Sequence, residues 1–256
     1  RIINMVNNSK CSVAVVVPCY RVRDSILQVV KDGLDHADAV YCVDDGCPDG
    51  SGKLVASKFD DERVRVIFAD QNGGVGSAMK AGYKAALEDG FDIMVKLDGD
   101  GQMDASLIPL FTAPIKRGAA DYCKGNRFHE LEYLSGMPAI RLFGNSVLSL
   151  MTKVSSGYWK LLDPTNGYTA IHASVLQLLP FEKLHNRYFF ESDMLFRLNV
   201  VRAVVRDIPM RAHYGDEESS LRVSHQLLPF IFGHMKNFFK RTFYTYFLRD
   251  FNIATL

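Results

Sequence analysis

Residues 94–102 read Met-Val-Lys-Leu-Asp-Gly-Asp-Gly-Gln, a largely apolar run that ends abruptly in two glycine-spaced carboxylates. The run predicts a buried strand over 92–97, and two acids two positions apart at the end of an extended segment point to the same side. Asp98 and Asp100 would therefore repel each other, and a hard divalent cation such as Mg²⁺ or Mn²⁺ would neutralise them. Isolated acid–glycine pairs also occur in plain polar turns, so the surrounding chain has to decide between the two interpretations.

Strand-like and helix-like segments alternate up to this stretch. Short apolar runs predict strands at 13–17, 39–43, 63–68 and 92–97, and the segments between them predict helices at about 25–37, 51–59 and 77–88. This alternation indicates a parallel sheet with helices on both faces and right-handed crossovers. Ligands bind beyond the carboxyl ends of the strands in such sheets, so we expect the four loops that follow the strands to share one rim. These loops read P-C-Y, D-D-G, D-Q-N-G-G and D-G-D-G.

Length and composition limit the class of protein. The 256 residues are 48% hydrophobic and carry a formal net charge of +1, which fits one large core with or without an appended element. The near-neutral charge argues against a nucleic-acid partner. Five cysteines without C-x-x-C spacing indicate reduced thiols of a cytosolic-side protein. The sequence has no signal peptide and no apolar run of about 18 residues, and we expect it to be an excerpt of a longer chain.

The second half of the chain is less regular. It predicts strands at 120–124, 168–172 and 204–210 and helices at about 140–153 and 187–199. From Leu227 to Phe251, nine Phe or Tyr residues interleave with Lys and Arg. This segment is either a pair of helices that cap the core or a basic aromatic helix on a membrane surface. We expect a main domain over residues 1–225 and a membrane-proximal helical segment over residues 226–256.

The order of the motifs resembles a known family. P-C-Y, V-D-D-G-x-x-D-G-S, N-G-G-V-G-S-A-x-x-x-G, D-G-D-G-Q, G-N-R-F, D-P-T-N-G-Y and F-F-E-S-D together resemble the family-two glycosyltransferases, in particular the dolichol-phosphate mannosyltransferase and polyprenyl-phosphate glycosyltransferase branch. The resemblance covers roughly residues 12–225. It implies a catalytic domain with the α/β GT-A (Rossmann-like) fold, in which helices cover both faces of a mostly parallel central sheet, followed here by C-terminal amphipathic helices. It also implies inverting transfer of a hexose from a UDP- or GDP-linked sugar.

The resemblance implies which residues would bind the donor. Asp98, Asp100 and Gln102 would hold Mg²⁺ or Mn²⁺ on the diphosphate, and this places Asp100 among the catalytic residues as well. Tyr20 would offer a ring to the nucleobase, and Asp45 would accept a hydrogen bond from it. The nucleotide-sugar contacts implied in full are Pro18, Tyr20, Val43, Asp45, Asn72, Gly74, Asp98, Gly99 and Arg127.

The acceptor decides whether a general base is needed. The oxygen of a polyprenyl phosphate is mostly ionised near neutral pH, because its second pKa is about 6, so it needs only cations to hold it. The resemblance implies Arg127, Arg141 and Arg211 or Arg222 for this task. Each of these arginines could equally be a solvated surface charge. A sugar hydroxyl needs a base, for which the candidates are Asp193 or Glu191 and then Asp163. Acids also favour the first turn of a helix, so Asp193 and Glu191 could simply cap theirs.

Three departures from the family pattern concern the identity of the nucleotide. The late loop reads E-E-S-S-L-R where the family has a Lys after G-E-S, so Arg222 is a displaced substitute. Arg21 and Val22 stand where the family usually has Asn and Glu, and Cys47 replaces the usual Ser. Alternatives to a lipid-phosphate transferase are a transferase with a glycan acceptor, a non-catalytic nucleotide-sugar-binding module and a sugar-1-phosphate nucleotidyltransferase. We expect the protein to act at the cytoplasmic face of a membrane, and a homo-oligomer is compatible with the sequence.

Overall fold

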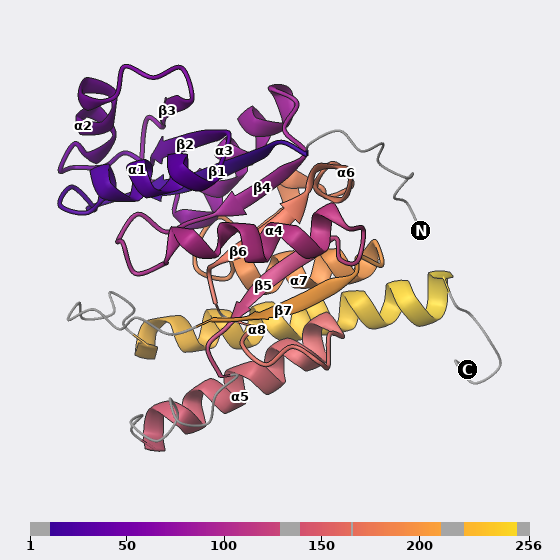
Figure 1. Cartoon of the computed structure of the whole chain (residues 1–256). Coiled ribbons are helices and arrows are strands. Elements are labelled where there is room, and N and C mark those ends of the chain that lie inside the picture. Colours follow the sequence, from indigo (N-terminus) through magenta and orange to yellow (C-terminus); the bar gives the residue numbers. More distant parts are fainter. Residues whose placement is uncertain (1–10, 129–138, 165, 211–222, 250–256) are drawn as a thin grey trace.

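The computed structural model describes residues 11–128, 139–164, 166–210 and 223–249. Within these residues a seven-stranded sheet has the order β3-β2-β1-β4-β6-β5-β7 (Figure 1). Neighbouring strands are parallel except around β6, which runs antiparallel to β4 and β5. The predicted mostly parallel α/β sheet is therefore confirmed. The strands are β1 (Val13–Cys19), β2 (Ala39–Asp44), β3 (Val64–Phe68), β4 (Ile93–Lys96), β5 (Tyr122–Asn126), β6 (Thr169–His172) and β7 (Val205–Pro209).

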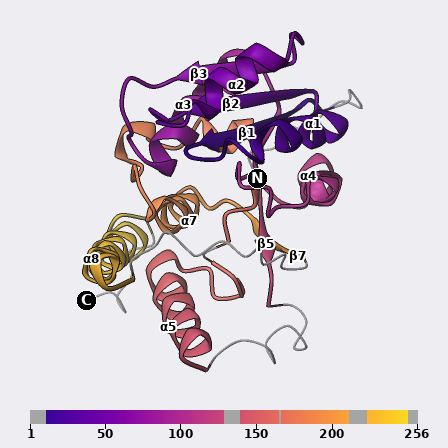
Figure 2. The same ribbon diagram turned by 90° about the vertical axis from the view of Figure 1, so that its left-hand side faces the viewer.

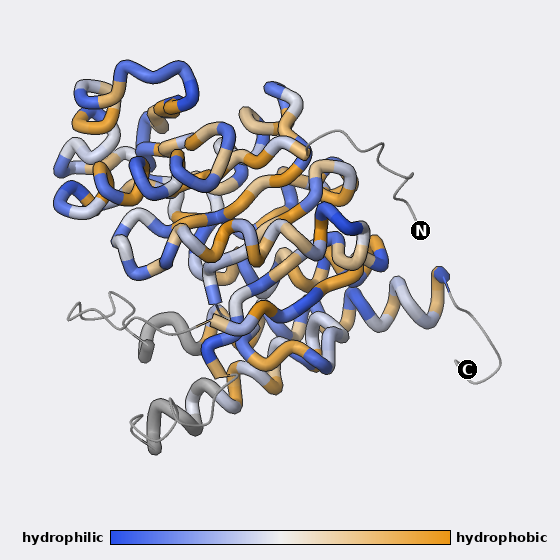
Figure 3. Tube along the Cα trace, viewed as in Figure 1, coloured by the Kyte–Doolittle hydropathy of each residue, from blue (hydrophilic) through white to orange (hydrophobic). Residues whose placement is uncertain are grey.

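Helices cover both faces of the sheet (Figure 2). One apolar layer joins the strands to α1 (Ile26–His36), α2 (Ser51–Lys58) and α4 (Ile108–Lys116). The other layer joins them to α3 (Val75–Glu88), α6 (Ala173–Leu176) and α7 (Phe190–Val200). Because both faces are buried, β1 and β2 are continuous apolar runs instead of alternating ones, and Figure 3 shows hydrophobic residues concentrated in the central strands.

The helix α4 was not predicted from the sequence. It contains Pro109 near its start and Pro114 inside it, and prolines normally argue against a helix. A proline in the first turn is tolerated, because the N–H that it lacks has no partner within the helix. The helix forms because Ile108, Phe111 and Ile115 are buried in the core, and the ring of Phe111 stacks on Tyr168 with centroids 4.1 Å apart. A short 3₁₀ helix, η1 (Ala105–Leu107), directly precedes α4, and another, η3 (Phe181–Lys183), lies between α6 and α7.

The C-terminal segment packs on the rest of the chain. It consists of α8 (Val223–Thr242) and a π-helical segment η4 (Phe243–Arg249), and α8 contacts both α7 and α5 (Ala139–Ser156). His234 and Asn237 on its inner side are buried, and Arg241 donates hydrogen bonds to the carbonyls of Val154 and Ser155 at the end of α5. The division at residues 225 and 226 stays a prediction. Among the described helices, none has the length and apolar character that crossing a bilayer requires.

Candidate active site

The loops that follow β1, β2, β3 and β4 meet at one rim, as the sequence predicts. The hydroxyl of Ser25 donates to the carbonyl of Gly99 at 2.7 Å, which joins the loop after β1 to the loop after β4. The two carboxylate oxygens of Asp45 accept the backbone N–H groups of Gly73 at 2.9 Å and Gly74 at 2.7 Å. Asp45 therefore ties the loop after β2 to the loop after β3. The chain adds β2 and β3 on one side of β1 and then places β4 on its other side. The rim lies at this reversal of strand order, which is the usual ligand position in a parallel sheet.

Two glycines allow these loops to approach each other closely. Gly46 has φ +62°, and a Cβ atom at this position would lie 2.7 Å from the backbone nitrogen of Asn72. A Cβ atom on Gly99 would lie 3.0 Å from the side chain of Val22 and 3.1 Å from the carbonyl oxygen of Pro18. Larger residues would push the loops apart and widen the rim.

The loop after β1 carries an exposed aromatic ring. Tyr20 is 41% exposed, and the guanidinium of Arg21 lies 5.5 Å from the centre of its ring. Arg21 has a left-handed backbone (φ +57°), and its N–H donates to the Sγ atom of Cys47 at 3.0 Å. Arg21 and Cys47, which both depart from the family pattern, thus contact each other. Val43, by contrast, has its side chain buried in the core against Gly82 of α3.

A buried lysine joins the D-G-D-G loop to α7. Lys96 is 3% exposed, and its Nζ atom lies 3.0 Å from Oδ1 of Asp98 and 2.9 Å from Oε1 of Glu191. Burial alone would lower the pKa of Lys96, but the two carboxylates raise it above its usual value. Burial alone would raise the pKa of Glu191, but Lys96 and Lys124 lower it below its usual range. Lys96 and Glu191 are therefore both charged near neutral pH.

Lys124 belongs to a polar row that crosses the sheet. Lys96 on β4 pairs with Thr169 on β6, Thr169 with Lys124 on β5, and Lys124 with Asp207 on β7. Directly paired residues lie on the same face of a sheet, so the row faces α7. Lys124 is completely buried and donates to the carbonyl of Asn166, and burial lowers its pKa to about 8.

The D-P-T-N-G-Y segment lies beside this row. The buried carboxylate of Asp163 accepts from Nε of Arg127 at 2.7 Å and from Nη2 at 3.1 Å, so it orients the guanidinium. A Cβ atom on Gly167 would lie 2.7 Å from Nζ of Lys96 and 2.9 Å from Oδ2 of Asp98. The backbone at Gly167 therefore packs directly against the first acid of D-G-D-G, and the segment joins Asp98 to Arg127.

Asp193 faces a different part of the molecule from Glu191. Side chains two positions apart on an α-helix point about 200° apart around its axis. Asp193 therefore faces α8, whereas Glu191 faces the sheet. Its carboxylate accepts hydrogen bonds from the N–H of His185 at 3.1 Å, Nε of Arg197 at 3.0 Å and Nδ2 of Asn237 at 3.2 Å. Of the two acids in F-F-E-S-D, the structure thus brings Glu191, and not Asp193, to the D-G-D-G loop.

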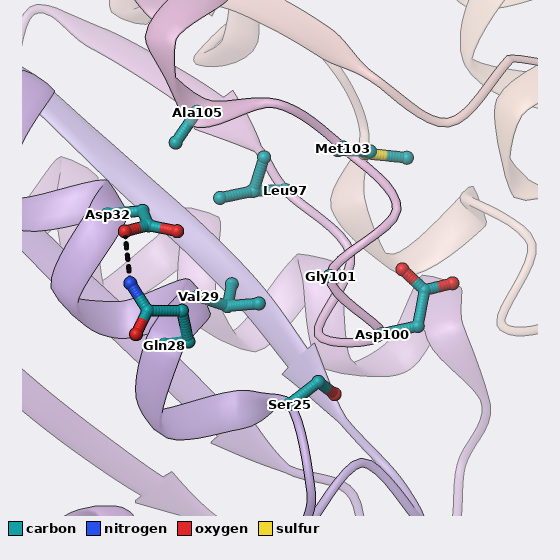
Figure 4. A pocket seen from close by; sticks show the side chains of 9 residues that line it. All are labelled: Ser25, Gln28, Val29, Asp32, Leu97, Asp100, Gly101, Met103 and Ala105. Carbon is teal, nitrogen blue, oxygen red and sulfur yellow. Dashed lines mark hydrogen bonds between the residues drawn. The ribbon is translucent and has the colours of Figure 1, made fainter. Parts of the chain in front are cut away.

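Asp100 lies at the tip of the loop after β4. Its Oδ1 atom accepts the N–H of Gln102 at 3.0 Å. Asp100 also borders a cavity of about 280 Å³ between this loop and α1, opposite the hydrogen-bonded pair of Gln28 and Asp32 (Figure 4). In this view the carboxylate of Asp100 points away from that pair.

The acids of this loop suit a hard cation. Asp98 and Asp100 supply carboxylate oxygens two residues apart, the donor type that Mg²⁺ and Mn²⁺ prefer. In the described part of the chain, no group of three or more His, Cys, Asp or Glu side chains is placed to hold a metal ion. Two carboxylates fill only part of the coordination sphere of such a cation, so its other ligands would be further oxygen atoms, such as those of a diphosphate.

Three predicted arginines could not be placed against the site. Arg211 and Arg222 lie outside the described residues, and Arg141 lies on α5 with its side chain outside them. Two buried lysines, in contrast, were missed by the sequence interpretation. A lysine within a buried strand is rare unless it is paired, so Lys96 within 92–97 and Lys124 within 120–124 carried a usable signal.

Comparison with known proteins shows the family to which the chain belongs. Residues 14–179 match the family model described as "Glycosyl transferase family 2", and the chain belongs to this family. It is 28% identical over 215 residues to a UDP-N-acetylglucosamine–dolichyl-phosphate N-acetylglucosaminyltransferase of Methanococcus voltae, covering 78% of this chain and 85% of that protein. It is also 28% identical over 203 residues to an undecaprenyl-phosphate mannosyltransferase of Micrococcus luteus, covering 77% and 82%.

A solved structure supports the fold assignment. Glucosyl-3-phosphoglycerate synthase from Mycobacterium tuberculosis, in complex with Mn²⁺, UDP and glucosyl-3-phosphoglycerate, superposes with a TM-score of 0.63 at 16% identity, covering 90% of this chain and 80% of that one. The expected GT-A-like fold and the expected family are thereby confirmed. The protein is a family-two glycosyltransferase.

Proposed function

We propose that this enzyme transfers a hexose from a UDP- or GDP-linked sugar to a polyprenyl or dolichyl phosphate, at the cytoplasmic face of a membrane. The proposal depends mainly on one property that the three candidate bases share. Each has a basic side chain within 3.0 Å: Glu191 has Lys96, Asp193 has Arg197, and Asp163 has Arg127.

Acids paired in this way suit a phosphate acceptor better than a hydroxyl acceptor. A general base works best when its pKa lies near the working pH. The pKa of Glu191 is lowered, which shifts it away from neutral pH. Asp193 faces α8, and Asp163 orients Arg127. A lipid phosphate brings an oxygen that is already mostly ionised, since its second pKa is about 6, so no protein base is required.

The donor would lie across the rim. We place the nucleobase between Tyr20 and Asp45, whose oxygens retain acceptor capacity beside their two backbone hydrogen bonds. The ribose and diphosphate would reach Asp98, Gly99 and Arg127. A Mg²⁺ or Mn²⁺ ion held by Asp98, Asp100 and Gln102 would stabilise the diphosphate as the leaving group.

Cations near the rim would hold the acceptor phosphate. Asp163 holds the guanidinium of Arg127, which stays 31% exposed and can meet a second anion. Arg141, Arg211 and Arg222 remain proposed contacts of the same phosphate. A fixed, planar guanidinium matches phosphate geometry well, which is why we assign this task to arginines.

An exposed apolar stripe on α8 would receive the lipid. Leu228, Phe232, Met235 and Phe239 recur three or four residues apart and are 48–66% exposed. Lys236 and Lys240 lie beside this α8 stripe, and η4 continues it with Phe243 and Phe247. Rings at the headgroup level and cations facing anionic lipid are typical of an interfacial helix. Figure 1 shows α5 and α8 beginning at the same side of the molecule as the rim.

Product analysis tests this proposed function. The protein is incubated with UDP-glucose, UDP-N-acetylglucosamine or GDP-mannose, with and without Mn²⁺, together with undecaprenyl phosphate. We expect a lipid-linked sugar monophosphate and an equal amount of UDP or GDP. Sugar transferred only to added glycan hydroxyls would support the glycan-acceptor alternative. Release of pyrophosphate would indicate a nucleotidyltransferase, and nucleotide binding without turnover would indicate a binding module.

A further inference from the structure

Lys96 lies 3.0 Å from Asp98 of the D-G-D-G loop, and neither the motif nor the proposed function assigns it a task. It lies in β4 among the buried residues Met94, Val95 and Leu97. An ammonium group in such a place is costly unless it is paired and hydrogen-bonded. An apolar residue would fill a buried strand position without this cost, so packing alone does not explain the lysine.

Asp98 is held from two sides. Lys96 contacts its Oδ1 atom at 3.0 Å, and the backbone of Gly167 leaves no room for a Cβ atom beside its Oδ2 atom, since that Cβ would lie 2.9 Å away. The side chain of Asp98 nevertheless remains 32% exposed. These contacts fix the orientation of the carboxylate while leaving part of the side chain accessible to solvent.

Glu191 holds the lysine from the opposite side. It is 12% exposed and accepts from Lys96 at 2.9 Å, so the ammonium is fixed between β4 and the first turn of α7. Lys124 adds a further positive charge near Glu191. Removing Lys96 would leave two neighbouring carboxylates without their common partner.

We propose that Lys96 is a positioning residue that orients Asp98 toward the donor diphosphate and its cation, and that Glu191 keeps Lys96 in place instead of serving as a base. The inference rests on the proposed function, because it presumes that Asp98 meets a nucleotide diphosphate. The competing explanation is purely structural: Lys96 could simply balance the charge of Glu191. The two explanations differ in what happens when both charges are removed together.

The experiment compares Lys96→Met, Glu191→Gln and the double variant Lys96→Met/Glu191→Gln. The readouts are the melting temperature and the affinity for UDP or GDP in the presence of Mn²⁺, measured by calorimetry without acceptor. Lys96→Met should lower the melting temperature, because Glu191 and Asp98 lose their common partner. It should also weaken nucleotide binding by about 10- to 100-fold, the usual range for groups that orient a ligand. Glu191→Gln keeps the contact between Lys96 and Asp98 and should weaken binding by less than about 10-fold.

The double variant separates the two explanations. Without either charge, its melting temperature should recover toward the wild-type value, yet nucleotide binding should stay as weak as in Lys96→Met. A double variant that is stable and binds nucleotide like the wild type would overturn the positioning role. Lys84→Met is the matched control, since the side chain of Lys84 is 74% exposed on α3, and it should change neither readout. Wild-type protein that binds neither nucleotide would overturn the proposed function itself, and the inference with it.

Discussion

Glu191 accepts a hydrogen bond from Lys96 over 2.9 Å, although 95 positions separate the two residues in the chain. This contact brings the late F-F-E-S-D motif to the D-G-D-G loop, because Lys96 also contacts Asp98. The first turn of α7 therefore supplies charge balance to the rim. The same contact lowers the pKa of Glu191, and a carboxylate with a lowered pKa is a poorer general base for a hydroxyl acceptor.

Replacing Gly167 by alanine should damage the site more than the fold. The added Cβ atom would lie 2.7 Å from Nζ of Lys96 and 2.9 Å from Oδ2 of Asp98, so the carboxylate must move. We expect kcat/KM for the nucleotide sugar to fall by about 100-fold, since misplacement of about 1 Å can cost that much. Gly144→Ala is the control, because a Cβ atom there meets nothing within 4 Å. Equal activity of both variants would contradict the close packing at Gly167.

Asp193→Asn should affect stability more than catalysis. The substitution removes the charge that pairs with Arg197 and weakens the link to Asn237 on α8, at a cost of about 1–3 kcal/mol. We expect a lower melting temperature and less than a tenfold change in kcat. A roughly thousandfold loss of kcat at an unchanged melting temperature would instead identify Asp193 as a general base. Glu88→Gln, at an exposed position of α3, is a suitable control.

Lys124→Met should change how stability depends on pH. The pKa of Lys124 is about 8 in the folded protein and 10.5 in the reference state. Between these values the unfolded chain binds more protons at this position, so the contribution of Lys124 to stability rises with pH. The variant should therefore gain melting temperature relative to the wild type at about pH 7.5, and this gain should shrink by about pH 9.5. A difference that is constant over the window would show that Lys124 does not titrate there.

Vesicle binding tests the α8 stripe. The double variant Phe232→Ser/Phe239→Ser removes two rings that are 66% and 63% exposed, so the fold should tolerate the change. Loss of this apolar area should weaken binding to anionic vesicles by at least about 10-fold. Phe68→Ser, which changes a 52% exposed ring on β3, should bind like the wild type. Equal binding by both variants would remove the membrane role of the stripe.

The first half of the fold was predictable because its signals are local. Strands buried on both faces are continuous apolar runs, and the carboxyl ends of β1 to β4 carry the polar loops. The helix α4 was missed because Pro109 and Pro114 suggest a break, whereas tertiary packing of Phe111 decides the outcome.

The roles of the acids were less predictable because they depend on distant partners. F-F-E-S-D presents two acids that look equivalent in sequence, and only the packing of α7 between the sheet and α8 directs Glu191 to Lys96 and Asp193 to Asn237. The buried lysines were visible as charges in strands. The function of these lysines could not be predicted from the sequence, because Glu191 and Asn166, which they contact, lie far along the chain.

The most direct test of the acceptor assignment is the pH dependence of kcat/KM with two lipid acceptors that differ only in acidity, a polyprenyl phosphate and the corresponding phosphonate. If the acceptor oxygen attacks in its ionised form without a protein base, the acidic limb of the profile follows the acceptor, near pH 6 for the phosphate and higher for the less acidic phosphonate. We predict that the limb moves with the acceptor and remains in Asp193→Asn. An acidic limb at the same pH for both acceptors would contradict the account, because it would belong to a base on the protein.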